Sequence, residues 1–199
     1  MPVSAFLSLS AALAAGSGAL GAGLERLGVS KRAAVFFLVS AAALSGFEIA
    51  AFGTAFFSPA CLLCAAAGAT PLYLWRGRAQ KILAALPALG AALAAGAALA
   101  PLFASSLPAA YYAAGLAGSL AAFVPRVRER GAAFVCAWAP IIGSVLAYAL
   151  PAPFGGAPFL TLSDSVLSAQ IMGFLSIAVL SSAFSRTPVR RPSDDRTTV

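Results

Sequence analysis

Histidine is absent from this sequence, and cysteine and acidic residues are scarce, with 3 cysteines and 6 aspartates and glutamates among 199 residues. The absence of histidine removes the side chain most used for proton transfer near neutral pH and the commonest metal ligand. Three cysteines, an odd number, imply no disulfide framework. We therefore expect a chain without a metal, without a cofactor and without histidine-based catalysis.

Charged residues of both signs make up only 10% of the chain, whereas 61% of the residues are hydrophobic. Soluble globular domains carry roughly 25% charged residues, so this chain has too little polar surface to stay folded in water. The composition predicts an integral membrane protein of the all-α class, a polytopic bundle of transmembrane helices in a lipid bilayer.

The net charge of +7 comes from basic residues in four short clusters. Each segment between clusters is long enough for two crossings, so every cluster can be cytoplasmic, as the positive-inside rule requires. This distribution favours membrane orientation over nucleic-acid binding. The clusters are Arg26 with Lys31 and Arg32; Arg76, Arg78 and Lys81; Arg126, Arg128 and Arg130; and Arg186, Arg190, Arg191 and Arg196.

The pattern predicts six spans with both termini inside, at about 33–53, 56–75, 82–103, 106–124, 132–150 and 165–184. The reversals fall at Gly53 to Pro59, Ser105 to Pro108 and Pro151 to Ser163. The third and fourth spans are mostly Ala, Leu and Gly, which lets helix backbones approach closely in lipid. The last reversal is expected to be irregular, with Phe154, Phe159 and Leu160 as a contact surface for a partner or the membrane interface.

Three regions follow from this division. Residues 1–32 form an apolar Gly/Ala arm and a basic cytoplasmic segment, in which residues 1–24 lie on the surface, are poorly ordered, or add a further span. Residues 33–184 form the transmembrane domain. Residues 185–199 form a polar tail expected to be disordered. The tail ends at Val199 in a form that PDZ domains capture.

Glu48 is the polar residue predicted to be embedded in the membrane, because it falls inside the first span. A carboxylate at that depth is costly and marks a candidate functional site. The alternative is that Glu48 lies near the outer face, protonated or bonded to Ser45 or Thr54, and fixes helix packing.

Cys61 and Cys64 are the alternative site, since cysteines three apart on a helix face the same way and a helix start favours a reactive thiolate. The pair resembles the Cys-x-x-Cys of the bacterial DsbB family of quinone-linked thiol oxidases. That resemblance implies a membrane thiol-disulfide oxidoreductase of a bacterial inner membrane. The second cysteine pair of that family has no counterpart in the predicted outer segments, and Ala65 to Ala69 is apolar where the family places a basic residue.

A second resemblance lies in the order of features between Ser30 and Ala79. It is similar to the alphaherpesvirus multi-span envelope protein that partners glycoprotein K, a family described with four spans. The resemblance implies a non-enzymatic protein of host endoplasmic reticulum, Golgi, nuclear and virion membranes that supports virion egress, glycoprotein trafficking and membrane fusion. The third hypothesis is a small transporter. The features are Ser30-Lys31-Arg32, Glu48 in Phe-Glu-Ile-Ala-Ala, Pro59-Ala60-Cys61, Tyr73, Trp75 and Arg78-Ala79.

Overall fold

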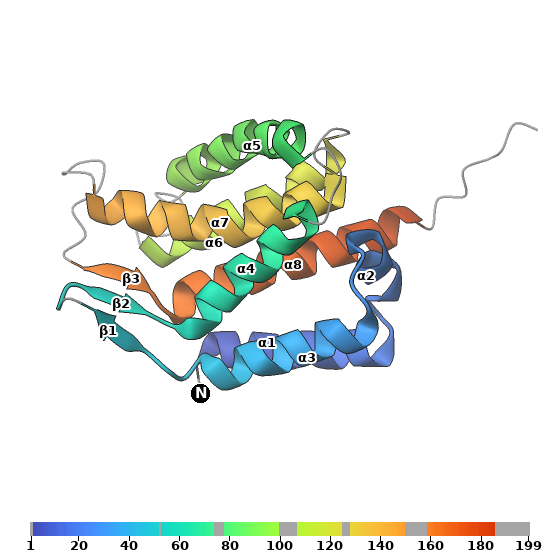
Figure 1. Cartoon of the computed structure of the whole chain (residues 1–199), viewed down its shortest axis with the longest axis horizontal. Helices are drawn as coiled ribbons and strands as arrows, with labels where there is room; N and C mark the ends of the chain where they lie inside the picture. The colour runs from blue at the N-terminus through green and yellow to red at the C-terminus, as the bar shows by residue number, and fades with distance from the viewer. Residues whose placement is uncertain are drawn as a thin grey trace, which may run out of the picture.

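Helices make up most of the chain in the computed structural model, which describes residues 2–51, 53–73, 78–99, 107–124, 128–149 and 159–185 (Figure 1). The all-α prediction is confirmed at the level of class. The helices are α1 Val3–Ser17, α2 Gly21–Leu27, α3 Lys31–Leu44, α4 Pro59–Tyr73, α5 Arg78–Leu99, α6 Leu107–Ser119 with the 3-10 helix η2 Leu120–Phe123, α7 Arg128–Ala149 and α8 Asp164–Ser185; three short strands are β1 Ile49–Ala51, β2 Ala55–Phe57 and β3 Leu160–Leu162.

The long helices run back and forth between two ends of the molecule (Figure 1). One end, here called the basic end, holds the starts of α3, α5 and α7 and the last residues of α8. The other, called the sheet end, holds β1, β2 and β3. Arg26, Lys31, Arg32, Arg128 and Arg130 all belong to helix termini at the basic end. The described long helices thus alternate in direction, and their arrangement as membrane hairpins stays a prediction.

Local signals explain where α2 and α3 stop and start. Ser30 caps α3, because its hydroxyl accepts a hydrogen bond from the Ala33 amide at 3.2 Å. Gly18 and Gly28 end α1 and α2 with φ of 88° and 75°, a backbone conformation that glycine adopts without strain. The chain consequently bends by 99° between α1 and α2.

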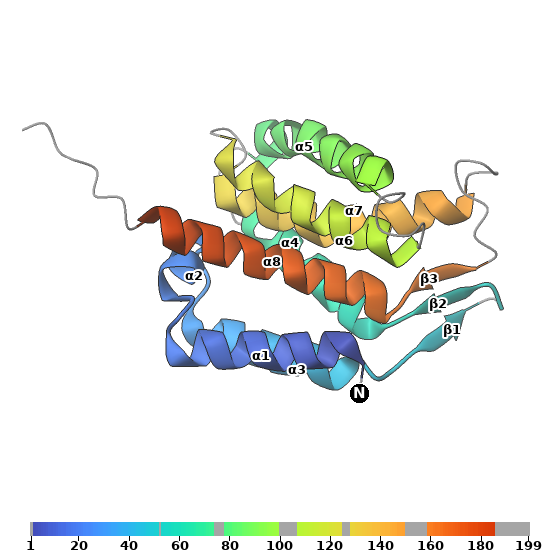
Figure 2. The same ribbon diagram turned by 180° about the vertical axis from the view of Figure 1, so that it is seen from behind.

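Residues 1–24 are not a poorly ordered arm, since α1 lies along α3 and its start is tied to α8 (Figure 1). The Asp164 carboxylate accepts hydrogen bonds from the amides of Val3 at 3.1 Å and Ser4 at 2.9 Å, and another from the Ser4 hydroxyl. These amides are the donors that a helix start leaves unpaired. Figure 2 shows the N-terminus beside the start of α8, at the sheet end.

That position bears on the predicted location of both termini on one side of a membrane, which stays a prediction. α1 begins at the sheet end, whereas α8 finishes at the basic end (Figure 2). The sequence could not show this because the deciding contact joins residues 160 positions apart. Residues 186–199, with the predicted disordered tail and the PDZ-type end at Val199, lie outside the described residues.

A three-stranded sheet replaces the helical end predicted for the first span. α3 ends at Leu44, and β1 pairs antiparallel with β2, with Ile49 opposite Phe57. Gly53, at φ 71°, lies in the turn between the two strands. β3 pairs in parallel with β2, with Leu162 beside Phe57. Residues 160–162 are thus ordered where an irregular loop was expected, because a distant strand supplies their hydrogen bonds.

Two described helices, α7 and α8, are long and apolar enough to cross a bilayer, or three spans if α1 and α2 count as one bent span. The first, second and fourth predicted spans correspond to shorter helices, α3, α4 and α6, whereas α5, in the third, has 22 residues but only a shorter apolar part, Ala85–Ala98. α3, for example, has 14 residues and is about 21 Å long at a rise of 1.5 Å per residue, less than the ~30 Å of hydrocarbon in a typical bilayer. By length and composition, the described helices therefore do not provide six full spans.

Small residues bring α6, α7 and α8 together. A Cβ placed on Gly115 of α6 would lie 2.5 Å from the Ala169 carbonyl oxygen of α8. A Cβ on Gly173 of α8 would lie 2.8 Å from Cys136 Cβ of α7. Such contacts leave no room for a larger side chain, which is the packing that the Ala- and Gly-rich composition favours.

Candidate functional site

The two predicted redox cysteines lie at the start of α4, where the helix leaves the sheet. Ser58 holds this start by donating its hydroxyl to the Leu44 carbonyl at 3.2 Å and its amide to the Leu162 carbonyl at 2.8 Å. Cys61 donates its thiol to the same Leu162 carbonyl at 3.2 Å. Both Cys61 and Cys64 are fully buried and unbonded to each other.

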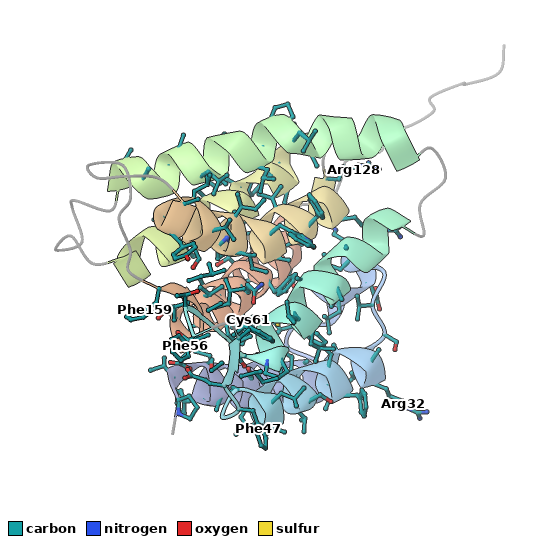
Figure 3. The ribbon with its side chains drawn as sticks, turned by 60° about the vertical axis from the view of Figure 1, so that its left-hand side comes forward. Arg32, Phe47, Phe56, Cys61, Arg128 and Phe159 are labelled. Atoms are coloured by element: carbon teal, nitrogen blue, oxygen red, sulfur yellow. The ribbon has the colours of Figure 1, made fainter. Side chains whose placement is uncertain are left out.

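Burial of this pair limits its chemistry. Disulfide exchange needs a thiolate that a partner's sulfur can approach. In this conformation, Cys61 and Cys64 are covered by α8 and by the end of β3, and Figure 3 shows Cys61 within the body of the molecule. Free buried cysteines behave as small hydrophobic residues with a weak donor. The geometry therefore favours packing over redox exchange.

Glu48 does not lie inside a helix, contrary to the prediction. α3 ends four residues before it, and Glu48 is an exposed residue between that helix and β1. Ser45, at the end of α3, bonds back to the Ala42 carbonyl at 2.8 Å instead of to Glu48. The helix stops here because Ser45 and Gly46 are followed by residues that pair as a strand.

Gln170 is a buried polar residue to which the sequence analysis assigned no role. Its side-chain amide on α8 donates to the Ala137 carbonyl of α7 at 2.7 Å and lies 3.4 Å from the Cys61 carbonyl of α4. It therefore ties three helices together. The signal available in the sequence was an amide side chain within a long apolar segment.

Large apolar side chains lie at the sheet end, in a group that we call the sheet-end surface: Phe47, Ile49, Phe56 and Phe159. Phe47, Ile49 and Phe159 are 63%, 47% and 49% exposed. The rings of Phe56 and Phe159 meet edge to face with centroids 5.9 Å apart. Figure 3 shows these two rings together, with Phe47 nearer α3. Phe159 had been predicted as a contact residue; Phe47 and Ile49 had been assigned to a membrane helix.

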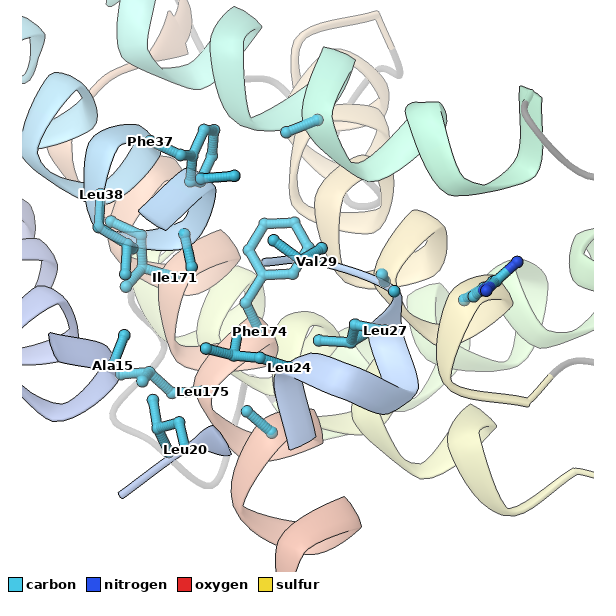
Figure 4. A pocket seen from close by; sticks show the side chains of 17 residues that line it. Ala15, Leu20, Leu24, Leu27, Val29, Phe37, Leu38, Ile171, Phe174 and Leu175 are labelled. Carbon is cyan, nitrogen blue, oxygen red and sulfur yellow. The ribbon is translucent and has the colours of Figure 1, made fainter. Parts of the chain in front are cut away.

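A cavity of about 550 Å³ lies toward the basic end, lined from α1, α2, α3, α4, α7 and α8 and from the α2–α3 turn. Leu24 and Leu27 of α2, Phe37 of α3 and Phe174 of α8 form much of its wall (Figure 4). Arg130, in the first turn of α7, is the charged residue among the described residues that line it. The sequence could not reveal this cavity because residues from six separate helices line it.

The described residues contain no candidate metal site, since no group of three or more Cys, Asp or Glu comes together among them. The Arg26 guanidinium and the Glu129 carboxylate form a surface ion pair at 3.4 Å, which joins α2 to α7. The arrangement offers helix packing, an apolar surface at one end and an apolar cavity at the other.

The chain matches no protein family, no curated protein and no solved structure. The resemblances to the alphaherpesvirus envelope protein and to the DsbB family therefore stay predictions. The observations available for a functional argument are the sheet-end surface, the cavity and the buried thiols.

Proposed function

We propose that this chain is a non-enzymatic multi-pass membrane protein that works by binding a second membrane protein through its sheet end. The supporting observation is the sheet-end surface, where three large apolar side chains remain roughly half exposed or more. Exposed apolar groups that cluster on a surface mark interaction sites. Aromatic residues also dominate the energetics of protein interfaces.

The chemistry of the sheet suits a protein partner. Among the described strands the order is β1-β2-β3, so β1 lies at an edge of the sheet. An extended segment of another protein binds such an edge by adding a strand. The positive residues at the opposite end support an outer position for the sheet end under the positive-inside rule.

The partner in this proposal is an envelope glycoprotein similar to glycoprotein K, as the resemblance between Ser30 and Ala79 implies. Binding would support trafficking of the glycoprotein from the endoplasmic reticulum, virion egress and membrane fusion. Host membranes and the virion envelope would be the sites of action. The alternative, a thiol oxidoreductase, gains no support from the burial of Cys61 and Cys64.

The test co-expresses the tagged chain with an alphaherpesvirus glycoprotein K and measures recovery of the glycoprotein in mild detergent. The double substitution Phe47→Asp with Phe159→Asp is expected to lower recovery on the order of tenfold, because it removes two aromatic anchors. The matched control is Phe123→Asp, which changes a phenylalanine of similar exposure, 48%, in η2 at the basic end.

Equal recovery with the double variant and the wild type, or equal loss with the Phe123→Asp control, would contradict the proposal. Replacing both Cys61 and Cys64 with Ala is expected to leave recovery intact, provided that the melting temperature in detergent shows a folded protein. Loss of function in that folded variant would instead favour the oxidoreductase.

A further inference from the structure

The cavity at the basic end combines an apolar wall with a cation at its rim. Leu24, Leu27, Phe37, Ile171 and Phe174 supply aliphatic and aromatic surface (Figure 4). Its volume of about 550 Å³ falls within the range of about 300–1,000 Å³ typical of small-molecule sites. A helix, about 10–12 Å wide with its side chains, is too bulky for this space, so the cavity does not suit a partner helix.

Arg130 belongs to the rim because of the backbone around it. Gly28 ends α2 at φ 75°, and a Cβ on Gly28 would lie 3.0 Å from Arg130 Nη2. The guanidinium therefore lies against the α2–α3 turn, at the basic end of the cavity.

The cavity runs from the basic end toward the sheet end, as an acyl chain runs from its headgroup into the bilayer. From the rim formed by Gly28, Ala33 and Arg130, it extends between α3 and α8 to Phe37 and Ile171. α3 and α4 diverge toward the basic end (Figure 1), and Ala33 of α3 and Ala67 of α4 line the space on their two sides. The basic end is also the side that faces the anionic cytoplasmic leaflet under the positive-inside rule.

We propose that this cavity binds one acyl chain of an anionic phospholipid, with the headgroup phosphate held by Arg130. Arginine binds phosphate through two parallel N–H groups, and the low dielectric of the apolar surroundings strengthens that contact. The wall offers an acyl chain the apolar contacts that it has in the bilayer. A fully water-soluble ligand would need more polar partners than the wall provides.

The experiment measures lipid bound to the intact chain by native mass spectrometry after purification in non-ionic detergent. Phosphatidylserine and diacylglycerol, which lacks the phosphate, are titrated separately with identical acyl chains. The wild type is expected to bind one phosphatidylserine at least several-fold more tightly than diacylglycerol. Arg130→Gln is expected to weaken phosphatidylserine binding on the order of tenfold or more, as for loss of a charge-assisted hydrogen bond, and to leave diacylglycerol binding unchanged.

Arg128→Gln is the matched control, because it removes the same charge two residues away from a side chain that is exposed and does not line the cavity. Two variants fill the cavity: Ala67→Phe from α4 and Ala33→Trp from its rim. Each is expected to abolish retention of both lipids, and Ala33, being exposed, is the safer site for folding. Melting temperatures identify the variants that remain folded.

Absence of any retained lipid in the wild type would overturn the proposal. Equal affinity for the two lipids, or an equal effect of Arg128→Gln and Arg130→Gln, would overturn the role of Arg130 and leave only non-specific adsorption. Lipid retention unchanged in both folded cavity-filling variants would place the lipid elsewhere. Because the glycoprotein test concerns the opposite end, either proposal can fail without the other.

Discussion

At the scale of single residues, polar side chains act as ties between distant parts of the chain. Asp164 binds the first turn of α1, and Gln170 joins α4, α7 and α8. Buried polar groups lose their hydrogen bonds to water, and in a protein with so few charges these contacts supply the hydrogen bonds instead. Asp164 was visible in the sequence as an acidic residue at a helix start, but its partners were not.

Replacing Asp164 with Ala is expected to destabilise the fold by about 0.5–2 kcal/mol, the usual loss for a helix cap. The amides of Val3 and Ser4 lose their acceptor, so α1 should loosen before the other helices. Hydrogen exchange of the α1 amides in detergent measures this directly. Asp164→Asn retains an acceptor oxygen and is the control; exchange unchanged in Asp164→Ala would contradict the assigned contact.

At the scale of elements, small residues decide which helices touch. α6 meets α8 at Gly115, and α4 meets α7 at Gly68, where an added Cβ would collide with Ala137. α5 is different, since Gly90 has nothing within 4 Å of an added Cβ. The composition alone predicted close helix packing for both Ala-rich segments, but it could not show which glycines make the close contacts.

Gly115→Ala and Gly90→Ala are therefore expected to have opposite effects. The first forces α6 and α8 apart and should cost about 1–3 kcal/mol, as overpacking does. The second relieves the helix cost of glycine and should stabilise by about 0.5–1 kcal/mol. Thermal melting in mild detergent compares them. Stabilisation by Gly115→Ala would show that the α6–α8 contact is not tight, and destabilisation by Gly90→Ala would contradict the open space beside Gly90.

At the scale of the whole molecule, the position of α1 sets the relation between the two termini. The charge clusters predicted an even number of crossings after Lys31, and the alternating helix directions agree with that pattern (Figure 1). α1 adds a passage from the sheet end to the basic end. The amino-terminal and carboxy-terminal ends of the described chain therefore lie at opposite ends of the bundle.

Single-cysteine labelling tests this arrangement, since the three native cysteines are fully buried and should give little background. Pro2→Cys and Arg32→Cys, introduced separately, are expected to react with a membrane-impermeant maleimide from opposite sides of sealed vesicles. The parent chain without either substitution is the control for background. Labelling of both positions from one side would support the original prediction of a cytoplasmic N-terminus and contradict the passage of α1 through the membrane.

The sequence by itself determined the mostly helical class and the close helix packing, because these depend on composition and on small residues along the chain, whereas the hairpin pattern across a membrane stays a prediction. It did not determine the sheet, the anchoring of α1 or the cavity. β3 pairs with a strand about a hundred residues earlier, Asp164 meets Val3 and Ser4, and the cavity is lined from several elements. Only the tertiary structure could decide these features, because each is a contact between segments with no local signal for one another.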